Sequence, residues 1–438
     1  MKPNQIRKML LNQINRVAEK PEDYCTNPKH DFTRKRKLPF KQLLKGIIGL
    51  GGGTLSKELL NMFNCSANAA SVSAFVQQRN KIKPEAFESI FKSFTTDLST
   101  DFNEDLRILA VDGSDIHIPT NPKDVDSFFP GTDGKKTYNL LHLNAMYDLN
   151  HQIYTDVVIQ KAKKVNEHKA FVDMVDCSDI KNALVIADRG YESYNNMAHI
   201  QEKGWKFLIR IKEGSRGIKK GLDLPLQPSF DVDITLKLTR KQTKETKALF
   251  KDRNHYKLVP SNTTFDYLPV KNKKHEKTQF YELKFRIVRF QITEDTFETI
   301  LTNLEREQYT PEKLKQLYAA RWGIETSFRD LKYTMGLLNF HSKKVMCIQQ
   351  EIYAHLIMYN FAEMITSYVI IKNKQRKYTY KANFSVAAHM CRLFYHEKTT
   401  SPDLEAVIAR NIIPIRPDRH RQRNLNGKTY SGFLYRIA

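Results

Sequence analysis

The chain has few cysteines, and those it has are widely spaced. Its five cysteines are distributed over 438 residues and include no C-x-x-C pair. Disulfide frameworks and structural zinc sites both need clustered cysteines. The sequence therefore argues against either and predicts free thiols in a reducing compartment.

The chain also lacks a long uninterrupted apolar run. The nearest to one, EIYAHLIMYNFAEMITSYVII at 351–371, carries Glu351, His355 and Glu363. Ionisable groups are costly at the centre of a bilayer, so this stretch is predicted to be a buried helix. The first residues, MKPNQIRKMLLNQINRV, lack the apolar region and cleavage site of a secretory signal, and we expect a cytoplasmic protein without membrane partners.

Acidic residues are scarce relative to basic ones. The 71 Lys and Arg residues outnumber the 48 Asp and Glu residues, which gives a formal net charge of +23. Such a field attracts polyanions, and nucleic acid is the first expected partner. An anionic membrane surface, the second candidate, is set aside because the best candidate segment for insertion carries ionisable groups. With 41% hydrophobic residues, the chain can still build ordinary cores.

Residues 1–100 are predicted to be helical and to form a DNA-binding domain. Short apolar segments alternate there with Gly- and Ser-rich turns, and the basic run RKRK at 34–37 favours phosphate contact, although a solvated run of charges is the default interpretation. The glycine run GLGGGT at 49–54 has neither the preceding strand nor the following Lys of a P-loop. It is interpreted as a turn between helices.

From about residue 105 the pattern changes to an α/β layout with a mixed sheet. LRILAVD is interpreted as a strand that ends at Asp112, and ALVIA at 183–187 as a strand that ends before Asp188. Between them, NLLHLNAMYDLNHQIYTDVVIQ predicts a hairpin that turns near Asn150. Residues 105–212 are therefore predicted to form the first part of an α/β core.

The remaining segments are assigned by composition and periodicity. Residues 213–305 are rich in Lys and Arg, with interleaved aromatics and strand-like alternation, which predicts an inserted basic β-subdomain. Residues 306–411 are predicted to complete the core and continue as helices. Residues 412–438 are predicted to form a basic tail.

The segment QLYAARWGIETSFRDLK at 316–332 combines an apolar stripe with a polar row. At about 100° per residue, Tyr318, Arg321, Glu325 and Lys332 fall within an arc of about 60° that borders the apolar face. A solvated row with an i,i+4 pair between Arg321 and Glu325 would explain this pattern. A functional row beside a buried face is the alternative.

Three carboxylates have a predicted placement that would let them meet. Asp112 and Asp188 follow buried strands, and Glu325 lies on a helix that returns after the insertion. Converging carboxylates repel one another unless cations neutralise them, and hard oxygen ligands suit Mg²⁺ or Mn²⁺. A site with two such ions can hydrolyse or join phosphodiesters.

The order and spacing of these residues resemble the DDE transposases of bacterial insertion sequences, within the group that has the signature Tyr-x2-Arg-x3-Glu-x6-Lys. The similarity extends over about 105–345. The matching segments are Tyr318, Arg321, Glu325 and Lys332, the DGS at 112–114 and the ADRGY at 187–191.

The resemblance implies an RNase H-like catalytic core with a β-strand insertion, flanked by helical N-terminal and C-terminal regions. It implies Asp112, Asp188 and Glu325 as ligands of two Mg²⁺ ions, for which Mn²⁺ can substitute. It implies Tyr318, Arg321 and Lys332 as contacts to a DNA end. The expected activity is cleavage of the element's ends and joining to target DNA, by a dimer assembled on DNA in a bacterial cytoplasm, associated with the nucleoid when bound.

Several alternatives remain at this point. Lone Asp residues often only cap strand ends, and Asp115 competes with Asp112, although its position turns it to the opposite face of the sheet. Arg189 is a phosphate contact or a surface ion pair. Trp322 is interpreted as a packing residue, and two histidines, His117 and His142, as satisfied sheet residues.

The aromatic residues and the reaction itself also leave choices open. The two tryptophans lie outside the insertion, so a flipped base would stack there on Phe250, Tyr256, Tyr267 or Tyr281. Two other functions share the same pattern: a nuclease that only hydrolyses DNA, and an inactive DNA-binding protein.

Overall fold

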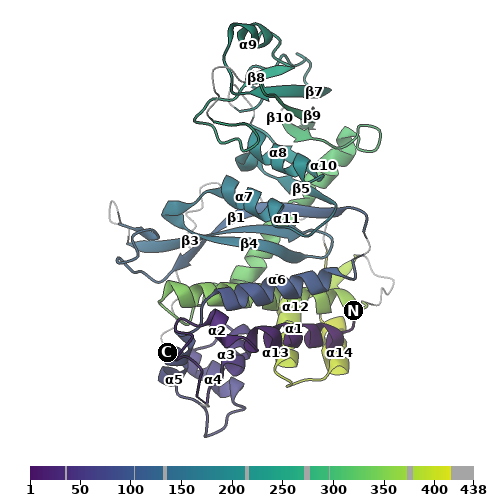
Figure 1. Ribbon diagram of the computed structural model, residues 1–438. Coiled ribbons are helices and arrows are strands. Elements are labelled where there is room, and N and C mark those ends of the chain that lie inside the picture. Colours follow the sequence, from purple (N-terminus) through teal and green to yellow (C-terminus); the bar gives the residue numbers. More distant parts are fainter. Residues whose placement is uncertain are drawn as a thin grey trace.

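A computed structural model describes residues 1–34, 37–102, 104–131, 136–212, 217–270, 277–294, 296–371 and 378–415. One large sheet crosses the middle of the molecule, helices cover both of its faces, and the tip with α9 (Lys244–Leu249) extends away from the N-terminal helices (Figure 1). The strands are β1 Arg107–Ile118, β2 Phe128–Phe129, β3 Tyr138–Asp148, β4 Ile153–Lys161, β5 Ala183–Ala187, β6 Lys206–Arg210, β7 Phe230–Thr239, β8 Tyr256–Leu258, β9 Tyr281–Thr293, β10 Thr296–Thr302, β11 Tyr380–Ala382 and β12 Ile412–Pro414.

Helices dominate the described residues before β1 and after β10, and most of them pack below the sheet in Figure 1. The predicted buried helix at 351–371 is confirmed as part of α12 as far as Tyr368, and the last three residues of the range lie beyond the helix. The helices other than α9 are α1 Pro3–Ala18, α2 Pro21–Tyr24, α3 Phe40–Ile48, α4 Leu55–Met62, α5 Val72–Arg79, α6 Glu85–Ser99, α7 Glu167–Asp176, α8 Tyr194–Glu202, α10 Pro311–Ala320, α11 Trp322–Arg329, α12 Val345–Tyr368, α13 Phe384–Tyr395 and α14 Ser401–Arg410.

Five strands, in the spatial order β4-β3-β1-β5-β6, form the core of the sheet. β1 pairs antiparallel with β3, and β3 with β4, whereas β1 with β5 and β5 with β6 are parallel. One face packs on α7 and α8, and the other on α6, α11 and α12. This arrangement confirms the predicted α/β fold with an RNase H-like core and a mixed sheet.

The strand that carries Asp112 is longer than the sequence indicates. β1 continues to Ile118 because β3 pairs with it from Leu109 to Ile118, so the prediction that the strand ends at Asp112 is wrong. What ends near Asp112 is the parallel pairing with β5, whose last pair is Val111 with Ala187. The other strand, β5, has its predicted bounds.

The strands of the predicted insertion continue the core sheet. β10 pairs antiparallel with β6, and β9 and β7 follow it in antiparallel order. β8 pairs parallel with β7, which differs from the antiparallel pattern that alternation predicts. The predicted domain boundaries stay predictions, but the insertion and the core share one sheet.

The N-terminal and C-terminal helices share one hydrophobic core with the sheet. This cluster joins side chains of α1, α3, α6, α12 and α13 to residues of β3 and β4.

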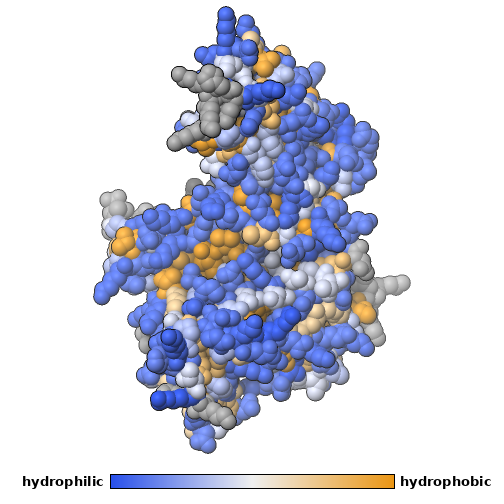
Figure 2. Space-filling model, viewed as in Figure 1, coloured by the Kyte–Doolittle hydropathy of each residue, from blue (hydrophilic) through white to orange (hydrophobic). Residues whose placement is uncertain are grey.

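Among the described residues, no helix is both long enough and apolar enough to cross a membrane. The visible face is largely hydrophilic, with apolar side chains gathered at the level of the sheet (Figure 2). The segment 416–438, most of the predicted tail, lies outside the described residues, as do residues 35 and 36 of the RKRK run.

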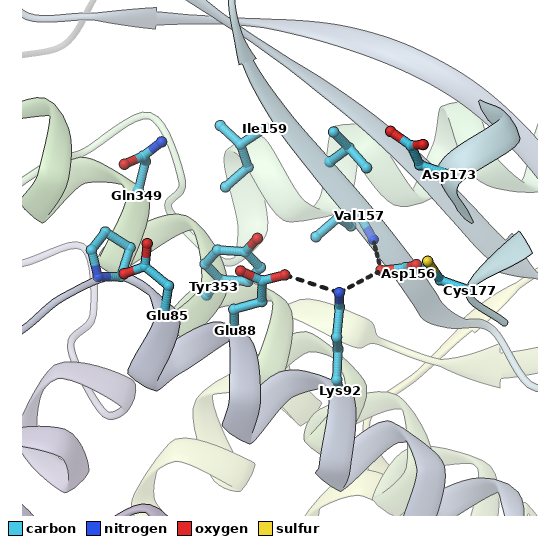
Figure 3. A pocket seen from close by; sticks show the side chains of 12 residues that line it. Glu85, Glu88, Lys92, Asp156, Val157, Ile159, Asp173, Cys177, Gln349 and Tyr353 are labelled. Carbon is cyan, nitrogen blue, oxygen red and sulfur yellow. Dashed lines mark hydrogen bonds and ion pairs between the residues drawn. The ribbon is translucent and has the colours of Figure 1, made fainter. Parts of the chain in front are cut away.

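The edge strand β4 is covered by polar side chains. Asn360 of α12 accepts from the Tyr154 N–H and donates to the Tyr154 carbonyl, both at 2.8 Å. Further along, Asp156 accepts from the Val157 N–H and lies near Lys92, beside the small pocket between α6, α12 and β4 shown in Figure 3. These contacts protect an edge that would otherwise offer free backbone groups to another strand.

A buried carboxyl in α12 predicts a pH-dependent stability. Burial raises the pKa of Glu363 to about 8, and the nearby Asp330 charge adds to the effect. Because this folded-state pKa lies above the ordinary value, the stabilisation is present at acidic pH and is lost as the pH rises through about 8. We expect Glu363→Gln to increase the free energy of unfolding, with a gain at least about 1 kcal/mol larger at pH 9 than at pH 5. Urea unfolding at both pH values measures this, and an equal gain at both would contradict it.

Candidate active site

Two neighbouring parallel strands bring Asp112 and Asp188 to the same edge of the sheet. The pairing of β1 with β5 ends at Val111 and Ala187, and each Asp is the next residue along the chain, Asp112 still within β1 and Asp188 directly after β5. Asp188 begins a short 3₁₀ turn, and its Oδ1 accepts from the Arg189 N–H at 2.6 Å. The fold thus places Asp112 and Asp188 side by side, as the sequence predicts.

The two aspartates of β1 face opposite sides of the sheet, as predicted. Ala110 and Ile116 pack in the core that includes α11. Asp112 lies an even number of residues from both, so its side chain is on the same face of the strand and faces α11. Asp115 instead contacts His142, its partner across the strand pair, with 2.7 Å between Oδ1 and Nδ1. Asp112 is therefore the aspartate that faces Glu325.

The segment with the polar row forms two consecutive helices, where the sequence indicates one. Thr310 caps α10 by accepting from the Lys313 N–H, α10 ends at Ala320, and α11 begins at Trp322. Gly323 lies so close to the sheet that a Cβ there would be 2.7 Å from Leu149 Cδ2. A π-helical turn, Asp330–Thr334, follows α11. Most of the apolar stripe is buried as predicted, with Ile324 and Leu331 both at 0% exposure, whereas Leu317 is only partly buried.

Arg321 joins two of the three candidate carboxylates. Its Nη2 donates to Glu325 Oε1 at 2.8 Å, and its Nη1 donates to Asp112 Oδ2 at 3.4 Å. The guanidinium side chain is 7% exposed, whereas those of Asp112 and Glu325 are 26% and 28% exposed. The i,i+4 pair that the sequence suggests is present, and the contact with Asp112 is a feature that no local pattern predicts.

The three carboxylates influence one another electrostatically. Burial raises the pKa of Asp112 to about 6, the Gly113 N–H and Arg321 oppose this shift, and the charges of Glu325 and Asp188 add to it. Mutual repulsion of this kind is relieved when a cation binds between the groups. The edge of the sheet is therefore an anionic site, and Arg321 is a counter-ion within it.

Of the other two predicted DNA contacts, Tyr318 is buried and Lys332 is half-buried. Tyr318 is 6% exposed and packs between β5, β6 and β9, and burial raises its pKa. Lys332, in the π-helical turn, donates from Nζ to the Asp115 carbonyl at 2.8 Å, and burial lowers its pKa. Trp322 is 50% exposed, so its interpretation as a packing residue is wrong; a new helix begins there and leaves its ring at the surface.

The three carboxylates, those of Asp112, Asp188 and Glu325, are chemically suited to bind a divalent cation. The part of the chain that the structure describes contains no group of three or more His, Cys, Asp or Glu residues already arranged to hold a metal ion. The Arg321 guanidinium lies between Asp112 and Glu325, which marks that position as one where positive charge is stabilised. Carboxylate oxygens are the ligands that Mg²⁺ and Mn²⁺ prefer.

Comparisons with known proteins point to one family. The family model described as Transposase DDE domain matches residues 103–361. No curated protein matches the chain. Among solved structures, the chain is similar to the cryo-EM structure of the piggyBac transposase synaptic complex with hairpin DNA, with a TM-score of 0.48 and 8% identity, covering 98% of this chain and 88% of that chain. Because the family model spans more than half of the sequence, the protein belongs to the family that carries the transposase DDE domain.

Proposed function

We propose that the protein cleaves DNA at the ends of an insertion sequence and joins the freed 3′-OH ends to target DNA. The observation that carries this proposal is the meeting of Asp112, Asp188 and Glu325 at one edge of the sheet, with Arg321 between two of them. Family membership supports a DNA-cleaving and DNA-joining enzyme. We also propose that the protein belongs to the group of these transposases that has the signature Tyr-x2-Arg-x3-Glu-x6-Lys.

In this proposal the three carboxylates hold two Mg²⁺ ions, for which Mn²⁺ can substitute. Bound there, the ions lower the pKa of the attacking water and neutralise charge on the leaving oxygen. The proposed ligands come from the interior of β1, the residue after β5 and helix α11, so the framework that positions them is rigid.

Arg321, Lys332 and Tyr318 are proposed to contact the DNA end near the scissile phosphate. Arg can bind a phosphate through two parallel hydrogen bonds, Lys supplies a point charge, and Tyr donates a hydrogen bond or stacks. The net charge of +23 supports double-stranded DNA as the partner. We propose that residues 1–100 and the insertion add further DNA contacts and that the protein dimerises when two ends meet.

The test is cleavage of a labelled duplex that carries the terminal sequence of the element encoding this chain. We expect cleavage at the element boundary with Mg²⁺ and none with Ca²⁺, followed by strand-transfer products when target DNA is added. Cleavage without strand transfer would indicate the hydrolytic nuclease. Tight binding without any cleavage would indicate the inactive DNA-binding protein.

Arg321 allows a sharper prediction within this proposal. Lysine keeps the positive charge but loses the planar fork that reaches Asp112 and Glu325 together. Losing one hydrogen bond to a charged group costs about 1.5–3 kcal/mol, so we expect Arg321→Lys to lower the cleavage rate about 10–100-fold. Single-turnover cleavage measures the effect, with the exposed Arg329→Lys as the matched control. Equal rates for the two variants would show that Arg321 acts only through its charge.

A further inference from the structure

A second charged cluster lies at the same edge of the sheet, on the face opposite the three carboxylates. His142 of β3 is 9% exposed and lies between Asp115 of β1 and Glu167, the first residue of α7. Nδ1 is 2.7 Å from Asp115 Oδ1, and Nε2 is 3.0 Å from Glu167 Oε1. Both ring nitrogens thus have a carboxylate partner, one from a strand and one from a helix.

The two carboxylates keep the ring charged. Burial alone would lower the pKa of His142, but the bonds to Asp115 and Glu167 outweigh burial and raise it to about 9. The bond to His142 in turn lowers the pKa of each carboxyl. The cluster is therefore a buried imidazolium with two anionic partners. Hydrogen bonds between charged groups are stronger and more directional than those between neutral groups.

The cluster lies where β1 has lost one of its neighbours. Beyond Val111, β5 no longer pairs with β1, so this part of the strand depends on β3 and on the cluster. Gly113 completes the fit, since a Cβ there would be 2.4 Å from His142 Nε2 and 2.9 Å from Glu167 Oε1. The position of the strand after Asp112 is thus coupled to that of the imidazole ring.

The cluster also reaches a proposed DNA contact. Lys332 donates to the carbonyl oxygen of Asp115, the residue whose side chain holds His142. One short stretch of β1 therefore carries three features: the side chain of Asp112, the backbone of Gly113 beside the His142 ring, and the Asp115 carbonyl that accepts from Lys332. A shift of this stretch would move a carboxylate and a lysine of the proposed site together.

We infer that His142 is a positioning residue, which fixes the β1 segment from Asp112 to Asp115 against α7 and so sets the Asp112 carboxylate and the Lys332 ammonium for the reaction. This inference rests on the proposed function. His142 does not contact the reacting atoms. It acts indirectly, by fixing the position of β1.

The chain contains a matched control for this role. His199 of α8 is also bracketed by two carboxylates, with Nδ1 3.0 Å from Asp176 and Nε2 2.9 Å from Asp266. Its exposure, 7%, is close to that of His142. Its hydrogen bonds join α8 to the end of α7 and to the insertion, whereas those of His142 join β3 to β1 and α7.

The experiment compares His142→Asn with His199→Asn in the full chain. Substitutions of residues that orient metal ligands typically cost about 10–100-fold in metal affinity or activity. For His142→Asn we expect a cleavage rate per folded molecule lowered by that factor, and a similar weakening of Mn²⁺ binding without DNA, measured by electron paramagnetic resonance. For His199→Asn we expect both quantities to stay within about twofold of the unsubstituted protein, with a comparable loss of thermal stability.

Glu167→Gln provides a second variant if His142→Asn does not fold. It keeps the shape of the cluster but removes one charge, and we expect a smaller loss in the same two quantities. If Mn²⁺ binding and cleavage per folded molecule are unchanged in either folded variant, the inference is wrong and His142 only stabilises the fold. If the unsubstituted protein binds Mn²⁺ but cleaves no terminal duplex, the proposed function fails instead, while Mn²⁺ binding still tests the positioning role.

Discussion

Replacing Glu325 by Gln is expected to lower the rate of DNA cleavage by a factor of about a thousand or more, which corresponds to about 4 kcal/mol of lost transition-state stabilisation. The neutral amide has the size of the carboxylate, and its oxygen can still accept from Arg321. It cannot supply the negative charge that Mg²⁺ or Mn²⁺ needs from its ligands. The loss should therefore appear in the chemical step, and DNA binding should persist.

Single-turnover cleavage of the terminal duplex and a binding assay in Ca²⁺ separate the two effects. Glu305→Gln is the matched control, because the side chain of Glu305 forms an exposed ion pair with Lys206. The control should cleave at the rate of the unsubstituted protein. Cleavage by Glu325→Gln at the same rate would mean that Glu325 is not a metal ligand and that the α11 helix does not serve the reaction as proposed.

The largest effect on stability is expected for Glu351→Gln, at about 3–5 kcal/mol of lost free energy of unfolding. Glu351 is fully buried in α12, 2.7 Å from the buried Arg79 of α5, and it also accepts from the His341 N–H. His341 in turn lies 3.0 Å from the Gly53 carbonyl, in the glycine turn between α3 and α4. The variant would leave a buried guanidinium without its countercharge.

The pH dependence of this network has a defined sign. Although burial opposes the shift, Arg79 and His341 lower the pKa of Glu351 to about 2. The resulting stabilisation is present above the ordinary Glu pKa and is lost as the pH falls towards 2. Urea unfolding at neutral pH measures the effect of Glu351→Gln, with Asp173→Asn as the control, since the exposed Lys169–Asp173 pair is worth at most about 1 kcal/mol. A loss as small as that of the control would mean that the network contributes little to stability.

Local sequence patterns predicted the elements that carry the site well. The strand at Ala183–Ala187 is apolar throughout and is found with its predicted bounds, and the hairpin turns between Asp148 and Ile153 near the predicted Asn150. The buried helix within 351–371 follows from apolar residues on all of its sides. Each of these predictions depends on side chains close in sequence, which is why the sequence alone suffices.

Features that depend on pairing between distant segments could not be predicted in the same way. β1 continues past Asp112 because β3 supports it, and β10 joins the core sheet because it meets β6. The interruption at Arg321 occurs without a proline, where the chain packs closely against the hairpin at Leu149. The roles of the six candidate site residues stay predictions, although the fold brings the three carboxylates to one edge.

The most direct test of the central claim is a change of metal specificity at the proposed ligands. In Asp112→Cys and Asp188→Cys, a thiolate replaces a hard oxygen ligand, and thiolates favour softer cations than Mg²⁺. Cleavage of the terminal duplex by both variants is predicted to be lost in Mg²⁺ and to recover, at least in part, when Mn²⁺ replaces it. Undiminished cleavage in Mg²⁺ by either variant would contradict the claim that these carboxylates bind the metal ions of the reaction.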